Sequence, residues 1–162
     1  MGYSTEFRGE FTLDKPLSPE HKAYLDAFSA TRRMKRDSAI AETLPDPIRI
    51  AAGLPIGIEG EYFVGNTNDF GQDHDVSVIN YNSPPSDQPG LWNQWTPSED
   101  GKYIEWDGGE KFYNYIEWLE YIIERFIGPW GYKLNGEVDW RGESWDDTGT
   151  IEIIDNKVTV KS

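Results

Sequence analysis

The sequence predicts an α+β fold, a ferredoxin-like split βαβ sandwich with an extended antiparallel sheet and a long loop-rich insertion. Two observations carry this prediction. The expected elements follow the order strand, helix, loop region, two strands, helix and three strands, which matches the split βαβ arrangement. The 162 residues suit one domain with its own core, and no internal repeat or linker divides them. We therefore predict a single domain over residues 1–162.

The N-terminal part begins with a strand and a helix. Residues 6–13 read EFRGEFTL, in which apolar and polar side chains alternate as they do in a strand with one wet face. Ser18, Pro19 and Glu20 then form a helix start, because a capping hydroxyl precedes a proline and an acid in the first turn. The pattern predicts a helix over 19–31.

The middle of the chain is rich in turn residues. Residues 43–60 hold three prolines and three glycines, which indicates loop around a short helical turn at 47–52. We predict a strand at 61–65 and a short strand at 76–81, the second within the turn-rich segment 66–90.

The C-terminal part has clearer patterns. Two strands joined by SEDG predict a hairpin over 91–97 and 102–108. Residues 110–127 carry an apolar stripe at helical spacing and are followed by Gly-Pro, which predicts a helix. Further strands are expected at 134–142, 149–155 and 157–160.

The net charge of −14 bears on the kind of partner. Residues 59–155 carry 21 acidic and 5 basic side chains, a net of −16. Such a charge opposes general binding to nucleic acid and favours a basic partner. The sequence has no cysteine, no segment apolar enough to span a membrane and a polar N-terminus. We expect a cytoplasmic protein that does not act at a membrane.

Several runs carry a resemblance that covers nearly the whole chain. They are RGEFTLDKPLSPEHKAYLDAFSATRRMKRD, GLWNQW, IEWDGGEKFYNYIEWLEYIIERF and LNGEVDWRGE. The chain resembles an uncharacterised family of small bacterial and phage proteins. The resemblance implies a phage or mobile-element setting and carries over no catalytic residues.

Aromatic and basic clusters supply the candidate ligand-binding residues. Trp92, Trp95 and Trp106 of the hairpin could stack on a base or another aromatic ligand, with help from residues 140 and 145, or could fill the core. Arg32 and Arg33, in the basic run that follows the first helix, could hold a phosphate or carboxylate, or could cap the helix. Since alternate residues of a strand face opposite ways, we expect at least one hairpin tryptophan to be exposed.

Metal and catalytic sites have weaker signals. Asp73, His74 and Asp75 have ligand side chains, but neighbouring strand residues point apart. The acids at 143, 146 and 147 lack the spacing of a calcium loop. We predict no metal, no cofactor and no catalytic residue, because the common catalytic motifs are absent from the sequence.

These observations lead to three hypotheses about function. The favoured one is a non-enzymatic binding protein that acts on a protein partner, and the phage resemblance makes that partner a host protein to be inhibited. The second is a small-ligand protein for a nucleotide signal. The third is a hydrolase that uses paired carboxylates, Glu105 with Glu137 or Asp107 with Asp139, on neighbouring strands. A homodimer through a sheet edge or a tryptophan face is a further alternative.

Overall fold

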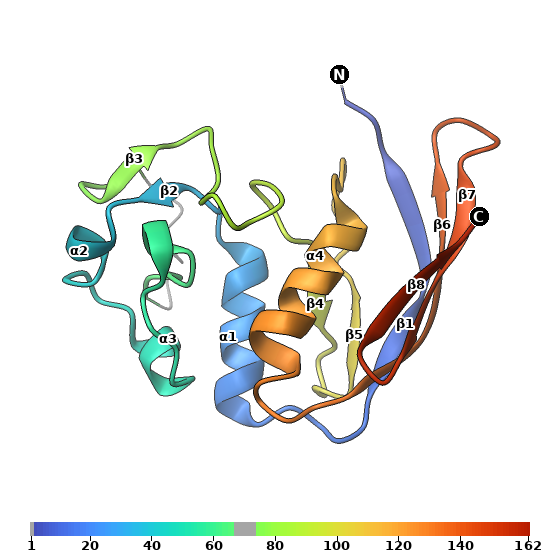
Figure 1. Cartoon of the computed structure of the whole chain (residues 1–162), viewed down its shortest axis with the longest axis horizontal. Coiled ribbons are helices and arrows are strands. Elements are labelled where there is room, and N and C mark those ends of the chain that lie inside the picture. The colour runs from blue at the N-terminus through green and yellow to red at the C-terminus, as the bar shows by residue number, and fades with distance from the viewer. Residues whose placement is uncertain (1, 67–73) are drawn as a thin grey trace. The chain divides into compact units, whose positions relative to one another are not determined.

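The computed structural model describes residues 2–66 and 74–162, and the chain forms two compact units. The sheet unit comprises Met1–Leu17 and Gln94–Ser162, and the inserted unit comprises Ser18–Asn93 (Figure 1). The chain mixes helices and strands, which confirms the α+β class. The single domain over 1–162 stays a prediction. Among the described residues, no helix is long and apolar enough to cross a bilayer.

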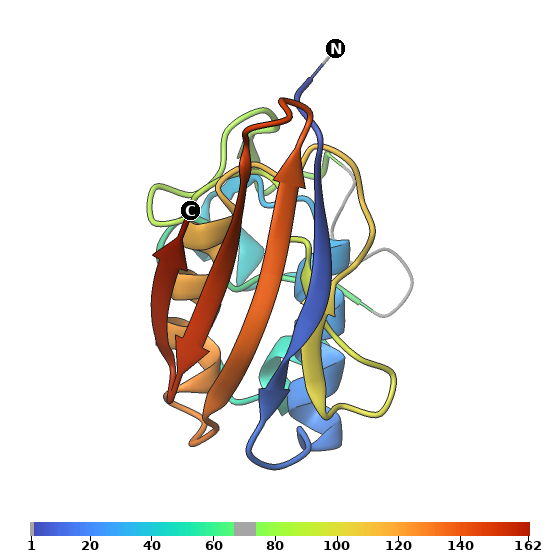
Figure 2. The ribbon, with the colours of Figure 1, turned by 90° about the vertical axis from the view of Figure 1, so that its right-hand side faces the viewer.

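Six antiparallel strands form the sheet of the sheet unit (Figure 2). Their order is β4-β5-β1-β6-β7-β8. β1 pairs with β5 on one side and with β6 on the other, so the first strand of the chain lies inside the sheet. The strands are β1 (Thr5–Leu13), β4 (Trp95–Pro97), β5 (Tyr103–Trp106), β6 (Leu134–Gly142), β7 (Thr148–Ile154) and β8 (Lys157–Lys161).

One face of this sheet is apolar and the other is charged, because successive side chains of a strand point to opposite faces. On β1, Phe7 and Phe11 are buried while Arg8 between them is exposed. On β6, Val138 is buried and its neighbour Asp139 is exposed. The helix α4 (Tyr115–Ile122) and its π-helical continuation η2 (Ile123–Ile127) lie behind the sheet in Figure 2.

An aromatic cluster around Phe7 forms the centre of this core. The Phe7 ring centroid lies 5.2 Å from that of Trp95, 5.3 Å from Trp106, 5.7 Å from Phe112 and 5.0 Å from Tyr115. All four contacts are edge-to-face, the arrangement that the ring quadrupoles favour, and each adds about 0.5–1.5 kcal/mol beyond the area buried. The cluster therefore joins β1 to the β4–β5 hairpin and to the start of α4.

Two of the predicted boundaries in this unit are wrong. The helix begins at Tyr115 rather than at residue 110, because Lys111 and Asn114 adopt positive φ angles of 56° and 58°, which a right-handed helix does not allow. Its end at Ile127 is as predicted. The first hairpin strand covers only 95–97 instead of 91–97, so Trp92 lies outside the strand.

The inserted unit contains α1 (Pro19–Ala30), with the Ser18 hydroxyl accepting from the His21 amide at 3.3 Å as predicted for a helix start. α3 (Pro47–Ala51) confirms the predicted helical turn. The predicted strand at 61–65 is wrong, because that segment follows η1 (Ile58–Gly60) as a turn and has no strand partner among the described residues. The remaining elements are β2 (Lys35–Arg36), α2 (Ser38–Ala41) and β3 (Val78–Asn80), which pairs with β2.

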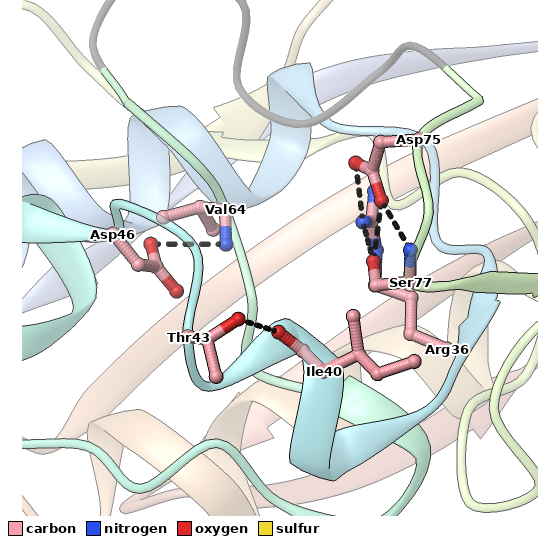
Figure 3. Close-up of polar contacts among 7 residues, drawn as sticks. All are labelled: Arg36, Ile40, Thr43, Asp46, Val64, Asp75 and Ser77. Carbon is pink, nitrogen blue, oxygen red and sulfur yellow. Dashed lines mark hydrogen bonds and ion pairs between the residues drawn. The ribbon is translucent and has the colours of Figure 1, made fainter.

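Hydrogen bonds to the carboxylates of Asp46 and Asp75 connect the loops of the inserted unit (Figure 3). Asp46, whose side chain is fully buried, accepts from the Arg49 Nε at 2.6 Å and from the Val64 amide at 3.3 Å. Burial raises the pKa of Asp46 despite the opposing effect of the Arg49 hydrogen bond and charge. The pair thus holds the short helix α3 against the 61–65 segment.

We expect Arg49→Met to lower the free energy of unfolding by about 3–5 kcal/mol, because it leaves a carboxylate buried without its counter-charge. Adding Asp46→Asn should restore part of the loss, since an amide needs no counter-charge. Urea denaturation followed by circular dichroism measures both. Lys22→Met is the matched control, because its ion pair with Asp26 is partly exposed to solvent, and ion pairs at the surface contribute about 1 kcal/mol or less. A loss in Arg49→Met no larger than in this control would contradict the prediction.

Candidate functional site

The loop between β6 and β7 is closed by its own backbone. The Gly142 amide donates to the Asp147 carbonyl at 2.8 Å, and the Asp147 amide donates to the Ser144 carbonyl at 2.9 Å. The loop begins at the end of β6 and ends at the start of β7, so the paired strands of the sheet hold both of its ends in place. The loop carries Trp145 at its tip.

Asp147 links this loop to the N-terminal segment and to the core. Its two carboxylate oxygens accept from the Tyr3 hydroxyl at 2.7 Å and from the Trp140 Nε1 at 3.0 Å. The Tyr3 hydroxyl in turn accepts from the Ser144 amide at 3.0 Å. A side chain near the start of the chain and one from the sheet core therefore hold the same carboxylate.

Two glycines make this close packing possible. A Cβ at Gly142 would collide with the Asp147 carboxylate and the Tyr3 hydroxyl. A Cβ at Gly149 would collide with the Trp140 indole. Larger residues at either position would push the loop away from the sheet.

Three exposed aromatic side chains lie around this loop, and we call them the aromatic patch: Tyr3, Tyr113 and Trp145. Trp145 is 85% exposed, Tyr113 is 51% exposed and Tyr3 is 37% exposed. The Tyr3 amide donates to the Tyr113 hydroxyl at 3.0 Å, which places these two residues side by side. Neighbouring exposed aromatics of this size mark interaction surfaces in soluble proteins.

The loop is also acidic. Glu143 and Asp146 are exposed, and Asp147 is next to them. The Ser4 amide donates to the Glu143 carboxylate, so this acid is oriented by the N-terminal segment. The aromatic patch therefore has a negatively charged border.

The structure brings together two of the predicted ligand-binding tryptophans on the core side of the sheet. Trp95 and Trp106 are cross-strand partners on β4 and β5, and Trp95 is only 1% exposed. The Trp95 Nε1 donates to the Tyr115 carbonyl at 2.9 Å, and the Trp106 Nε1 donates to the Gln94 side chain at 2.9 Å. Both rings contact Phe7, but only Trp95 is fully buried, whereas Trp106 is half-buried; this supports the core interpretation for Trp95 and only in part for Trp106.

Trp92, Arg32 and Arg33 belong to the inserted unit. Trp92 is 36% exposed, in agreement with the expectation that one tryptophan of this region is exposed. Arg32 lies 4.2 Å from the Tyr81 ring centroid and donates to the Tyr81 carbonyl and to Asn82. The Arg33 amide bonds to the Leu91 carbonyl at 2.8 Å, so the basic run is attached to the Trp92 segment through its backbone.

The other arginines of the basic run are structural. Arg33 is 2% exposed, and its guanidinium donates to the Glu61 carbonyl and stacks over the Phe28 ring. Arg36 is equally buried and donates to Asp75 at 2.9 Å and to Ser77 at 2.8 Å (Figure 3). Thus neither guanidinium is presented to solvent.

Of the acids and histidine considered as metal ligands, Asp73 lies outside the described residues. Burial alone would raise the pKa of Asp75, but hydrogen bonds from Ser77 and Arg36 outweigh it and lower that pKa. His74 is near the Tyr81 ring, with centroids 6.1 Å apart. Within residues 2–66 and 74–162, no group of three His, Asp or Glu side chains could hold a metal ion.

The carboxylate pairs proposed for a hydrolase do not lie on neighbouring strands. β1 separates β5 from β6, so Glu105 and Glu137 are not cross-strand neighbours, and Asp107 lies beyond the end of β5. The hydrolase hypothesis set these two strands side by side, whereas the ferredoxin-like pattern predicted for the same chain places the first strand between them, and the observed order agrees with that pattern. The strand register instead forms a row of three glutamates across β1, β6 and β7. Glu10 is opposite Glu137, and Glu137 is opposite Glu152.

Sequence reasoning missed Tyr3 and Tyr113 as members of an exposed site. Neither belongs to a motif, and Tyr3 reaches the β6–β7 loop only because β1 pairs with β6. The signal for the loop was present in GESWDDTG, where a tryptophan among turn-forming and acidic residues is unusual for a core position.

We expect Asp147→Asn to loosen the β6–β7 loop at neutral pH, because Tyr3 and Trp140 donate to different carboxylate oxygens and asparagine replaces one of these by an NH2 group that cannot accept. Protection of the Gly142 and Asp147 amides against hydrogen exchange, measured by NMR, should fall. Bonds from Tyr3 and Trp140 lower the pKa of Asp147. Its contribution is therefore present at neutral pH and is lost as pH falls through the folded-state pKa.

The matched control for this experiment is Asp146→Asn, because the Asp146 side chain forms no hydrogen bond within the described part of the chain. Its amide protection should equal that of the wild type. Unchanged protection in Asp147→Asn would show that the carboxylate does not hold the loop.

The two classes of tryptophan should respond differently to truncation. Trp95→Ala should lower the free energy of unfolding by about 3–5 kcal/mol, since it opens a cavity in the core. Trp92→Ala should cost clearly less, because Trp92 is 36% exposed and lies outside the tightly packed core. Urea denaturation compares them, and equal losses would contradict the assignment of Trp95 to the core.

Comparison with known proteins adds no family. No family model, curated protein or solved structure matches this chain. The resemblance to small bacterial and phage proteins stays a prediction, and the function has to be argued from the site itself.

Proposed function

We propose that this chain is a non-enzymatic binding protein whose sheet unit docks on a protein partner through the aromatic patch. The observation that carries the proposal is Trp145, 85% exposed on a loop that hydrogen bonds keep closed. Tryptophan and tyrosine are the side chains that most often dominate the binding energy of protein interfaces. Because the loop is ordered before binding, docking loses little conformational freedom.

The surroundings of Trp145 define the chemistry of the partner. The Trp145 indole would bind in an apolar pocket of the partner. The two tyrosines would add contact area at the solvent-accessible rim of the interface, where their hydroxyls can form hydrogen bonds. The acids at 143 and 146 and the net charge of −14 favour a basic border around that pocket. The same charge would accelerate association with a basic protein.

A second copy of the chain is the competing occupant. The predicted homodimer could form through the aromatic patch or through the outer edge of β8, whose only strand partner in the described sheet is β7. Two acidic patches facing each other would repel, which disfavours self-association through Trp145. Lysines at both ends of β8 also protect that edge.

The proposal also covers the kind of cell in which the protein acts and its effect on the partner. The resemblance to bacterial and phage proteins supports a partner in a bacterial host and an inhibitory effect on it. We also propose a cytoplasmic location, with which the lack of cysteine is compatible.

We infer a ferredoxin-like arrangement for the centre of the sheet. Its support is the order β4-β5-β1-β6 together with the antiparallel pairing of these strands. In the split βαβ pattern, the first strand lies between the third and the fourth, as β1 lies between β5 and β6. β7 and β8 would then extend that sheet.

The test begins with capture of proteins from a bacterial lysate by the immobilised chain. We expect wild type and Trp92→Ala to retain the same protein, and Trp145→Ala to lose it. With that protein purified, titration calorimetry should show at least a roughly tenfold weaker affinity for Trp145→Ala, the effect of removing a hot-spot side chain. Trp92→Ala is the matched control because it removes an exposed tryptophan of the inserted unit.

Sedimentation analysis tests the competing occupant with the same variants. The wild type should be a monomer at micromolar concentration. A wild-type dimer that Trp145→Ala dissociates would assign the patch to a second copy and overturn the proposal. Retention of the captured protein by Trp145→Ala would also overturn it.

A further inference from the structure

We propose that a hollow on the charged face of the sheet binds the phosphate group of a small phosphorylated molecule. The hollow has a volume of about 440 Å³, which lies within the range of small-molecule pockets. It lies over β1, β6 and β7, away from the apolar face that builds the core. The side chains that matter for its chemistry are Glu6, Arg8, Asp139, Arg141, Thr148 and Thr150.

The strand register brings two arginines together in this hollow. Arg8 on β1 is opposite Asp139 on β6, and Arg141 on β6 is opposite Glu6 on β1. Arg8 and Arg141 are therefore diagonal neighbours on one face, where backbone positions are about 7–8 Å apart and long side chains can reach a shared ligand. The pairing that creates this proximity joins segments from opposite ends of the sequence.

The described part of the protein leaves both arginine side chains without a bound partner. Each is opposite a carboxylate within reach, but within the described residues neither side chain forms an ion pair or hydrogen bond. Asp139 instead accepts from the Thr150 hydroxyl at 2.7 Å. This differs from Arg33 and Arg36, whose guanidinium groups are bound by carbonyl or carboxylate oxygens of the inserted unit. Two exposed guanidinium groups beside a hollow are thus available to an external anion.

The number of donors favours a phosphate over a carboxylate. A carboxylate has two oxygens, and a single arginine fork already satisfies both. A phosphate monoester has three terminal oxygens and about two negative charges, which suit two forks and a hydroxyl. Thr148 supplies such a hydroxyl, since its side chain makes no hydrogen bond within the described part of the chain.

The acids of the hollow define the rest of the ligand. Glu6 and Asp139 accept hydrogen bonds and so fit the hydroxyl groups of a sugar. The neighbouring row of Glu10, Glu137 and Glu152 would repel an extended polyanion. A single phosphate on a small polyol therefore fits better than a polyphosphate chain or a nucleic acid. The structure assigns anion binding to Arg8 and Arg141 of the sheet unit, whereas the sequence pointed to Arg32 and Arg33.

Calorimetric titration with ribose 5-phosphate, inorganic phosphate and ribose tests the proposal. We expect ribose 5-phosphate to bind most tightly, inorganic phosphate more weakly and ribose not at all. Arg8→Gln and Arg141→Gln should each weaken binding of ribose 5-phosphate by roughly tenfold or more, as expected for the loss of charge-assisted hydrogen bonds. Arg141→Lys should recover only part of the affinity, because an ammonium lacks the fork.

Lys157→Gln is the matched control, since it removes one positive charge from the same face outside the hollow. Its affinity should equal that of the wild type. NMR shifts of the amides from Thr148 to Thr150 on titration should locate the ligand, and circular dichroism checks that each variant is folded. No saturable binding of ribose 5-phosphate, equal binding of ribose, or equal weakening in Lys157→Gln would each overturn the proposal.

Discussion

The packing of aromatic rings on Phe7 is the constraint on which the sheet unit depends. Phe7 lies on β1, and the rings that surround it come from the β4–β5 hairpin and from the residues at the start of α4. Once this ring faces inward, the period of the strand fixes the direction of every other side chain on β1. Because alternate side chains of a strand face opposite sides, the inward direction of Phe7 also places Arg8 on the charged outer face. A shift of the register by one residue would bury Arg8 and expose the cluster.

The aromatic patch and the hollow proposed for phosphate binding lie on different parts of the same paired sheet. The aromatic patch lies at one end of the sheet, where Asp147 joins the β6–β7 loop to Tyr3 and Trp140. The hollow proposed for phosphate binding lies on the charged face of the sheet, over β1, β6 and β7. Both depend on the antiparallel pairing of β1 with β6, which unites residues near the two ends of the chain. Sites placed on strands and short closed loops are well ordered before they bind, which favours specific contacts.

Arginine has contrasting roles in the two units. In the inserted unit, Arg33, Arg36 and Arg49 are buried, and their guanidinium groups bind carbonyl and carboxylate oxygens that connect loops with little regular structure. This unit has few strand ladders, so side-chain hydrogen bonds satisfy backbone groups that secondary structure would otherwise pair. In the sheet unit the backbone is already paired, and Arg8 and Arg141 remain directed to solvent. Burial, rather than clustering in the sequence, therefore separates structural arginines from those available to a ligand.

The sequence by itself determined the local structure wherever a period or a cap was strong. The strand over 6–13, the helix that Ser18 caps, the end of the second long helix and the last three strands all follow from patterns within one element. It also determined the acidic character and the absence of thiol chemistry. Only the tertiary structure decided the register of β1 against β6, which brings Arg8 and Arg141 together on one face of the sheet. It likewise decided which tryptophans are buried, because burial depends on neighbours that are distant in the sequence.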